Sequence, residues 1–106
     1  MGLLDFFRGP GLDRGVEEYR STPGALLLDV RTLPEFREGH VPGALNLPLQ
    51  ELDRIARVVP EKSTPLFLYC RSGARSGQAA EILEGMGYSK VKNIGGIISY
   101  KGKVVR

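Results

Sequence analysis

Apolar residues gather in short runs of strand length, separated by amphipathic segments. Residues 25–30 and 65–69 are almost wholly apolar, which is typical of strands that are covered on both faces of a sheet. Two shorter strands are expected at residues 44–47 and 90–93. Four of the intervening segments are expected to be helices: residues 13–19, 34–38, 49–58 and 74–86.

This alternation predicts an α/β fold with a central parallel sheet and helices on both faces. Gly95 and Gly96 are expected to form a tight turn before a last turn of helix. In such folds ligands bind beyond the carboxyl ends of the strands. Cys70 directly follows the apolar run 65–69 and therefore falls at that place.

The 106 residues suffice for one domain, with 42% hydrophobic and 25% charged residues. Residues 13–106 are expected to form this domain. Residues 1–12 are expected to be an amino-terminal extension with a short amphipathic helix, ended by Gly9-Pro10-Gly11. One side of that helix would carry its apolar side chains, Leu3, Leu4, Phe6 and Phe7.

The net charge of +3 comes from scattered Lys and Arg residues, so we expect no nucleic-acid partner. The longest apolar run ends at Asp29, well short of the roughly 20 residues of a membrane helix. No basic leader precedes the apolar residues near the start, and no membrane partner is expected. We expect a cytoplasmic protein that is a monomer or a weak dimer.

Cys70 is the single cysteine and His40 the single histidine. An internal disulfide and a zinc site built on several thiolates are therefore excluded, and no metal or cofactor is expected. A lone thiol also fits a reducing compartment. Any covalent intermediate on Cys70 would have to be resolved by a nucleophile from another molecule.

The residues after Cys70 favour its ionisation. A thiol is nucleophilic as the thiolate, and a position at a helix amino-terminus lowers its pKa. The segment from Arg71 to Arg75 is small enough to form a nest of inward-facing N–H groups, in which Gly73 can take a positive φ. The Arg71 and Arg75 side chains would attract and orient an oxyanion. We expect an ionised sulfur at the mouth of this loop, open to a donor.

The alternative interpretation of Cys70 is an inert small hydrophobic residue at the end of a buried strand. An inert thiol needs neither of the flanking arginines, Arg71 and Arg75. The pattern of strand, Cys-Arg-x-Gly-x-Arg and helix therefore favours a reactive cysteine.

Three separated motifs resemble the single-domain rhodanese family. They are Asp29-Val30-Arg31 with Glu35-Phe36 and Gly39-His40-Val41-Pro42-Gly43-Ala44-Leu45-Asn46, then Cys70-Arg71-Ser72-Gly73-Ala74-Arg75, and then Asn93-Ile94-Gly95-Gly96-Ile97. They occur in the family's order and cover roughly residues 13–100. The chain departs from the family pattern at Tyr100, where a Trp is common, and no amino-terminal strand is visible before Asp13.

The resemblance implies a sulfurtransferase. Cys70 would take the sulfane sulfur of thiosulfate as a persulfide, with release of sulfite, and pass it to cyanide or a thiol. The substrate would be bound by Arg71, Ser72, Gly73, Ala74 and Arg75. The expected partners are a small anionic sulfur donor and an external thiol acceptor, either a small thiol or a dithiol protein.

Asp29 and Ser76 are candidates for support of the site. Asp29 ends a strand on the same side of the sheet, although binding of Arg31 or of backbone amides is the favoured role. Ser72 and Ser76 could donate hydrogen bonds to bound sulfur or could cap the following helix. His40 lies in a turn before a strand, and a role as general base is disfavoured.

Two other function classes stay open. Cysteine-dependent phosphatases also hold an oxyanion in a strand–loop–helix arrangement, but they have five residues between Cys and Arg. Only four residues separate Cys70 from Arg75 here, which suits a sulfur atom better than a phosphoryl group. A non-catalytic binding module is the other alternative, disfavoured by the presence of Cys70 and both arginines.

Overall fold

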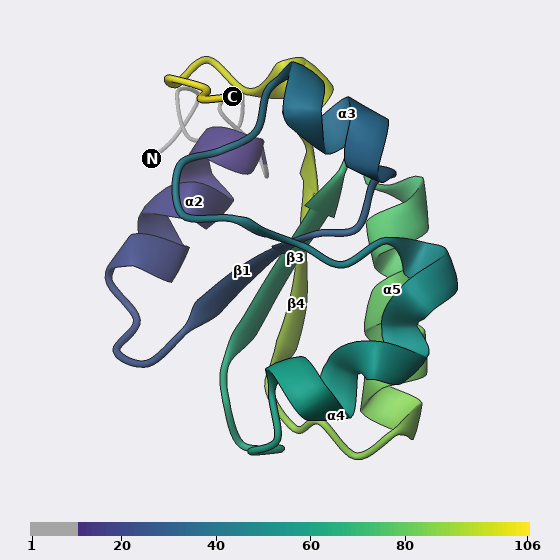
Figure 1. Ribbon diagram of the computed structural model, residues 1–106. Coiled ribbons are helices and arrows are strands. Elements are labelled where there is room, and N and C mark those ends of the chain that lie inside the picture. The colour runs from purple at the N-terminus through teal and green to yellow at the C-terminus, as the bar shows by residue number, and fades with distance from the viewer. Residues whose placement is uncertain (1–10) are drawn as a thin grey trace.

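The computed structural model describes residues 11–106 and shows a four-stranded, all-parallel sheet (Figure 1). The expected helix within residues 1–12 lies almost wholly outside the described residues. The strands follow the order β2-β1-β3-β4. Their bounds are Leu26–Asp29 for β1, Leu45–Asn46 for β2, Leu66–Cys70 for β3 and Val91–Gly96 for β4.

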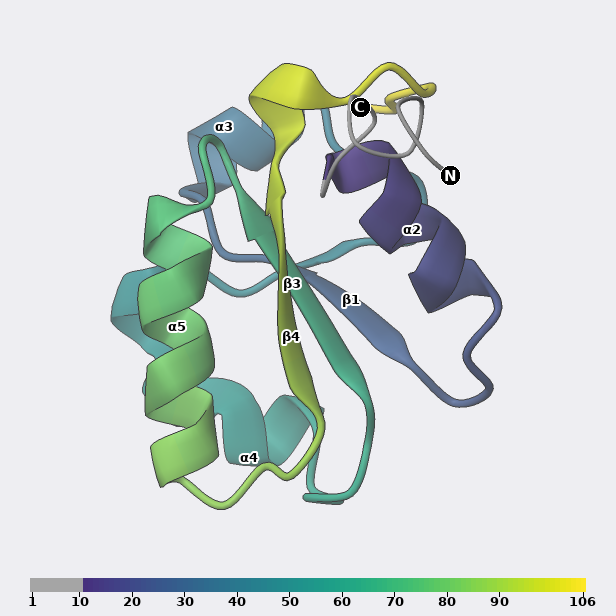
Figure 2. The same cartoon turned by 180° about the vertical axis from the view of Figure 1, so that it is seen from behind.

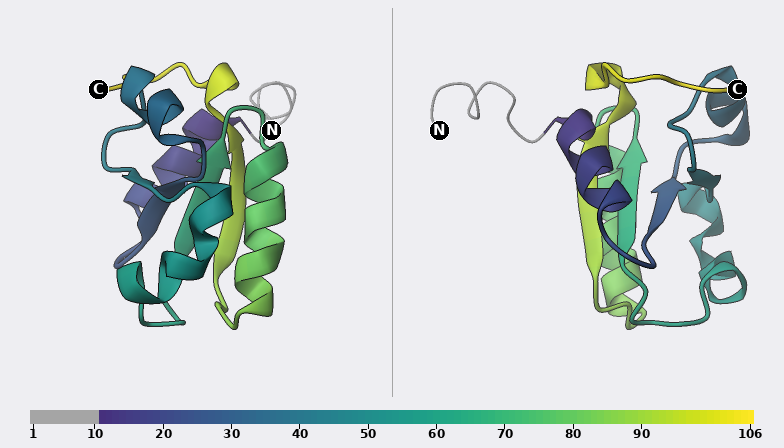
Figure 3. Two further views of the ribbon diagram at one scale, coloured as in Figure 1. Left: turned by 45° about the vertical axis from the view of Figure 1, so that its right-hand side comes forward. Right: turned by 90° about the vertical axis from the view of Figure 1, so that its left-hand side faces the viewer.

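Helical segments connect the strands and cover both faces of the sheet. In Figure 3, the view on the right shows α2 on one side of the strands and α4 on the other, and Figure 2 shows α5 alongside β4. The predicted α/β fold is confirmed. The segments are α2 (Leu12–Arg20), α3 (Leu33–Glu38), η1 (Leu49–Arg54), α4 (Ile55–Val58), α5 (Ala74–Gly85) and η2 (Ile97–Ser99).

Two apolar clusters, one on each face of the sheet, explain why the central strands are unbroken apolar runs. Successive side chains of a strand point to opposite faces, so a strand that is covered twice has no polar face. In β3, Phe67 and Tyr69 join the cluster beneath α2, whereas Leu66, Leu68 and Cys70 join the cluster beneath α4 and α5. All five residues of β3 are buried. The sulfur of Cys70 therefore faces the α5 side.

The segment expected to be one helix over residues 49–58 is two shorter pieces. A 3₁₀ helix, η1, runs to Arg54 and the α-helix α4 follows, with a non-helical backbone at Glu51. The helix α2 starts at Leu12, one residue before the expected helix at residues 13–19, and Leu12 is fully buried in the core. Local periodicity does not encode such burial in a tertiary core.

The short helix α3 lies over the carboxyl end of the sheet, near the start of α5 (Figure 1). Its amino-terminus is fixed by a capping box. The Thr32 side chain accepts a hydrogen bond from the Glu35 backbone N–H, and the Glu35 carboxylate accepts one from the Thr32 N–H at 2.9 Å. Pro34 lies in the first turn, as expected. The capping box thus orients Glu35.

Membrane-spanning helices and clusters of candidate metal ligands are both absent from residues 11–106, the part of the chain that the structure describes. None of the helices there has the length and apolar character needed to cross a membrane. Side chains of His, Cys, Asp and Glu in this part of the chain form no group of three that could hold a metal ion.

Candidate active site

Cys70 is the last residue of β3, and the loop that follows it leads within four residues into α5 at Ala74. Gly73 is the amino-terminal cap of α5 and takes a φ of +104°, a left-handed conformation that favours glycine. The predicted positive φ is confirmed. This turn bends the chain back over the end of the strand, so that the loop and the first turn of α5 surround the cysteine side chain.

Backbone N–H groups converge on the sulfur of Cys70. The Gly73 N–H donates to Sγ at 3.0 Å and the Ser76 N–H at 3.4 Å, and the Ser72 N–H contributes as well. We call these three donors the amide nest. Burial raises the pKa of the Cys70 thiol, but the hydrogen bonds from the Ser76 hydroxyl and the amide nest outweigh it, and the net pKa is lowered. The inward-facing amides that the sequence predicts are therefore present.

Ser76 has a more specific place than helix capping. Its Oγ lies 3.4 Å from Cys70 Sγ, 3.2 Å from the Gly73 carbonyl oxygen and 2.7 Å from Asn93 Oδ1. A hydroxyl has a single proton, which can be directed to Asn93 when the cysteine is a thiol and to sulfur when it is a thiolate. Since α5 has no side-chain cap, the interpretation of Ser72 and Ser76 as caps is wrong.

Asn93 holds the other end of this network. Its Nδ2 donates to the Gly73 carbonyl at 3.1 Å, and its Oδ1 accepts from the Gly95 N–H at 3.1 Å. The side chain thus ties β4 to the residue that forms the turn of the active-site loop. Asn93 and Ser76 are both positioned by contacts outside the sulfur itself.

The expectation of an open sulfur is wrong. Cys70 has 0% relative exposure, and the loop backbone and Ser76 cover its sulfur. The covering layer is thin, because Arg71, Ser72 and Ala74 are exposed on the surface. In this structure the sulfur is therefore covered by the loop and by Ser76.

Arg75 is engaged in a two-pronged ion pair. Its Nη1 donates to Glu35 Oε1 at 2.8 Å and its Nη2 to Glu35 Oε2 at 3.0 Å. The Arg75 hydrogen bond is the largest cause that lowers the pKa of Glu35 to about 2, so both groups are charged at neutral pH. The same pair raises the pKa of Arg75, with a further contribution from the Cys70 thiolate. Arg75 is thus close enough to Cys70 to sense its charge.

Gly96 allows β4 to pass close to the active-site loop. A Cβ atom at Gly96 would lie only 2.1 Å from the Arg71 carbonyl oxygen and 2.6 Å from Ser72 Cα, which no side chain can satisfy without movement of the backbone. The expected tight turn at Gly95 and Gly96 is wrong, since both residues belong to β4. The Arg71 carbonyl then accepts a hydrogen bond from the Ile98 N–H at 3.1 Å, which joins the loop to η2.

Asp29 does not contact the active-site loop. It lies opposite Tyr69 in the register of β1 and β3, so its side chain shares the face of Tyr69, and Cys70 faces the other way. Its carboxylate accepts from the Arg31 backbone N–H at 2.9 Å and from Arg31 Nε and Nη2 at 3.0 and 2.6 Å. The favoured interpretation, in which Asp29 holds Arg31, is confirmed.

His40 and Tyr100 have structural contacts away from the sulfur. The His40 ring stacks on Phe36, with centroids 3.6 Å apart, and its Nδ1 lies 2.8 Å from the Phe36 carbonyl oxygen. Its backbone pairs with Val105. Tyr100 packs against the apolar cluster beneath α2. These contacts agree with the low weight that the sequence gives to His40 as a base.

The structure adds two residues to the site that the sequence analysis did not assign a role. In the sequence, Glu35 and Asn93 are only parts of longer motifs, and their partners Arg75 and Ser76 lie 40 and 17 residues away along the chain. The signal available was polarity. Glu35 is a polar residue of α3, a helix without buried residues, and Asn93 is an exposed polar residue of β4.

Comparisons with known proteins agree with this geometry. A rhodanese-like domain profile matches residues 14–103. Thiosulfate sulfurtransferase PspE of Escherichia coli is 48% identical over 71 residues, which cover 66% of this chain and 68% of that protein. A sulfurtransferase of Allochromatium vinosum is 42% identical over 80 residues, 74% of each chain.

Among solved structures, a rhodanese with anions from E. coli superimposes with a TM-score of 0.72 at 42% identity, covering 77% of this chain and 98% of that one. The profile match, the named relatives and the shared fold lead to the same assignment. The chain belongs to the rhodanese-like domain family and is a sulfurtransferase of the rhodanese type.

Proposed function

We propose that this sulfurtransferase takes a sulfane sulfur from thiosulfate and carries it as a persulfide on Cys70. The Cys70 thiolate attacks the outer sulfur of thiosulfate and forms a new S–S bond. The S–S bond of the donor breaks, and its electron pair leaves with sulfite. One thiolate and one thiosulfate dianion thus yield one persulfide anion and one sulfite dianion, without an external oxidant or reductant.

This proposal rests on one observation: several N–H groups converge on Sγ of Cys70, the only thiol of the chain. The amide nest and the Ser76 hydroxyl lower the pKa of Cys70, which raises the thiolate fraction at neutral pH. The same donors would stabilise the terminal sulfur of the persulfide, which bears the negative charge after the first step. An inert buried cysteine would need none of these contacts.

An anionic donor is supported by the cations around the loop. Arg71 is exposed, and the Arg75 side chain retains 32% of its exposure beside Glu35. A guanidinium offers several N–H donors in a planar fork, which suits the oxygens of a sulfonate group. We therefore propose Arg71 and Arg75 as the residues that bind the sulfonate end of thiosulfate, with the backbone of Ser72, Gly73 and Ala74 around the transferred sulfur.

The acceptor would be an external thiol, with cyanide as an assay substitute. Because Cys70 is the only cysteine, no second thiol of this chain can attack the persulfide. An acceptor thiolate attacks the terminal sulfur, a new S–S bond forms on the acceptor, and the Cys70 thiolate is the leaving group. Two such half-reactions give ping-pong kinetics. We propose a reducing cytoplasm as the setting, where acceptor thiols stay reduced.

The direct test is the mass of the intact protein after incubation with thiosulfate. We expect a gain of one sulfur atom per chain, one sulfite released per chain, and loss of the added mass on treatment with a thiol reductant. In Cys70→Ser both the mass gain and the sulfite release should be abolished, because a hydroxyl is not ionised at neutral pH. Arg54→Ala, on the distant helix η1, serves as a matched control and should gain the sulfur normally.

Two outcomes would defeat the proposal. A mass gain that persists in Cys70→Ser would show that a group other than Cys70 carries the sulfur. No mass gain in the wild-type protein, in a preparation whose Cys70 is shown to be reduced, would leave thiosulfate without a role as donor.

A further inference from the structure

The Glu35 carboxylate occupies the Arg75 guanidinium, which the proposed reaction needs for the donor. Both Nη atoms of Arg75 are hydrogen-bonded to the two carboxylate oxygens of Glu35. A sulfonate that binds the same guanidinium would use the same two N–H directions, because two oxygens of either a carboxylate or a sulfonate can accept the two N–H groups of the planar guanidinium. The carboxylate and the substrate anion are thus alternatives at one site.

Glu35 is held in place independently of Arg75. Its Oε1 also accepts hydrogen bonds from the Thr32 N–H at 2.9 Å and from the Thr32 hydroxyl at 3.0 Å. Through these contacts the carboxylate belongs to the capping box of α3, a different element from the active-site loop. Its position beside the first turn of α5 is therefore built into the fold, and α3 is joined to the loop through this pair.

The pair is accessible enough to be exchanged. The side chains of Arg75 and Glu35 are 32% and 29% exposed, so water and anions can reach both. Ion pairs with this exposure contribute about 0–1 kcal/mol to stability. Arg75 directly precedes Ser76, whose N–H and hydroxyl cover the Cys70 sulfur. The exchangeable pair therefore lies directly beside the residue that covers the nucleophile.

We propose that Glu35 is a specificity-determining residue that competes with the anionic sulfur donor for Arg75. This inference rests on the proposed use of an anionic donor by Cys70. A neutral reagent cannot replace the Glu35 carboxylate on Arg75, whereas an anion can form its own ion pair with the freed guanidinium. Glu35 thus determines how strongly an anionic donor must bind Arg75 to displace the carboxylate.

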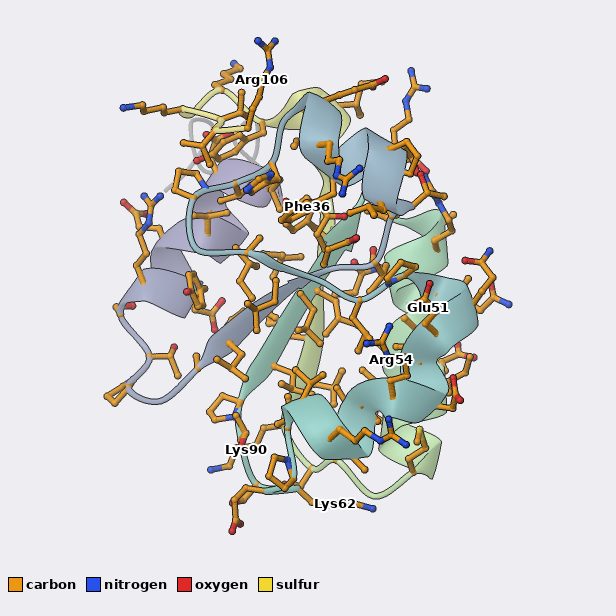
Figure 4. The ribbon with its side chains drawn as sticks, in the orientation of Figure 1. Phe36, Glu51, Arg54, Lys62, Lys90 and Arg106 are labelled. Atoms are coloured by element: carbon orange, nitrogen blue, oxygen red, sulfur yellow. The ribbon has the colours of Figure 1, made fainter. Side chains whose placement is uncertain are left out.

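The variant Glu35→Gln isolates the charge from the fold. Glutamine serves equally at this position of a capping box, so its amide oxygen can keep the Thr32 N–H while its amide NH₂ turns toward the guanidinium. The carboxylate is lost and Arg75 becomes available to an anion. Glu51→Gln is the matched control, because Glu51 pairs with Arg54 at 2.7 Å and takes no part in the site. Figure 4 shows the two labelled side chains near each other on the helical segment that includes η1.

The first readout is alkylation of Cys70 by iodoacetate and iodoacetamide, which differ in charge. It requires no turnover and therefore tests Glu35 separately from the use of thiosulfate. In Glu35→Gln the ratio of the iodoacetate rate to the iodoacetamide rate should rise at least about threefold at low ionic strength, and the rise should shrink as salt is added. In Glu51→Gln the ratio should match that of the wild-type protein.

The second readout is steady-state transfer from thiosulfate to cyanide. The KM for thiosulfate should fall at least about threefold in Glu35→Gln, because the donor no longer displaces a carboxylate. An unchanged or lower alkylation ratio would overturn the inference, and so would a KM that stays equal or rises, which would mean that Glu35 positions Arg75 for the donor. If the wild-type protein does not use thiosulfate, the proposed function fails and the alkylation ratio alone decides on Glu35.

Discussion

Two arginine–carboxylate pairs lie near the carboxyl end of the sheet, and they differ in solvent exposure. In the Asp29–Arg31 pair the Asp29 side chain is 0% and the Arg31 side chain 7% exposed. In the Glu35–Arg75 pair the corresponding values are 29% and 32%. The hydrogen-bond chemistry is the same, with two Arg N–H groups on two carboxylate oxygens in each pair.

Burial decides what each pair can do. Nη2 of Arg31 also donates to the Gly39 carbonyl at 2.8 Å, so a second segment holds the buried guanidinium in addition to Asp29. Exchange of Asp29 for another anion would require both charges to pass through the core, and the pair is fixed as part of the scaffold. The Glu35–Arg75 pair faces water and can change partners at low cost. The buried Asp29–Arg31 pair therefore stabilises the fold, whereas the more exposed Glu35–Arg75 pair can exchange its carboxylate for another anion.

The largest expected effect comes from breaking the buried pair. Asp29→Asn leaves the Arg31 charge buried without a counter-ion, so the free energy of unfolding should fall by about 3–5 kcal/mol. Glu35→Gln, in which the remaining charge is half-exposed, should lose about 1 kcal/mol or less. Equilibrium unfolding in urea measures both. Equal losses in the two variants would remove the distinction between a scaffold pair and an exchangeable pair.

Removal of Arg75 should act on catalysis more than on folding. Arg75→Ala deletes the guanidinium and leaves the Glu35 carboxylate unpaired where the donor binds. A hydrogen bond to a charged group is worth about 1.5–3 kcal/mol, so the rate at low thiosulfate should fall by about tenfold or more. Arg54→Ala provides the control for loss of an exposed arginine. A wild-type rate at low thiosulfate in Arg75→Ala would show that Arg75 does not bind the donor.

The sequence predicts those parts of the site that depend on residues close together along the chain. The apolar runs locate β1 and β3 because both faces of these strands are buried, and the run that ends at Cys70 locates the nucleophile at the edge where parallel strands present ligands. The small residues after it predict the positive φ of Gly73 and the inward-facing amides. These features are local, and a chain pattern suffices for them.

Features that join distant segments were beyond such a pattern. The partner of Arg75 is 40 residues away on α3, and neither residue reveals the other. The need for glycine at Gly96 arises from the Arg71 carbonyl of the active-site loop, 25 residues earlier in the chain. The complete burial of Cys70 has the same origin, because Ser76 and the loop fold back over the sulfur. The sequence indicates which groups are present but not how closely tertiary packing brings them together.

The most direct test of the central claim is the titration of the Cys70 thiolate by ultraviolet absorbance, with the Cys70→Ser protein subtracted. Since the chain has one cysteine, the difference reports that thiol alone. The account predicts a pKa below that of the same thiol in the urea-unfolded protein, and a pKa shifted upward in Ser76→Ala, which lacks one donor to the sulfur. A folded-state pKa equal to or above the unfolded value would contradict the claim that the amide nest holds a thiolate ready to accept sulfur.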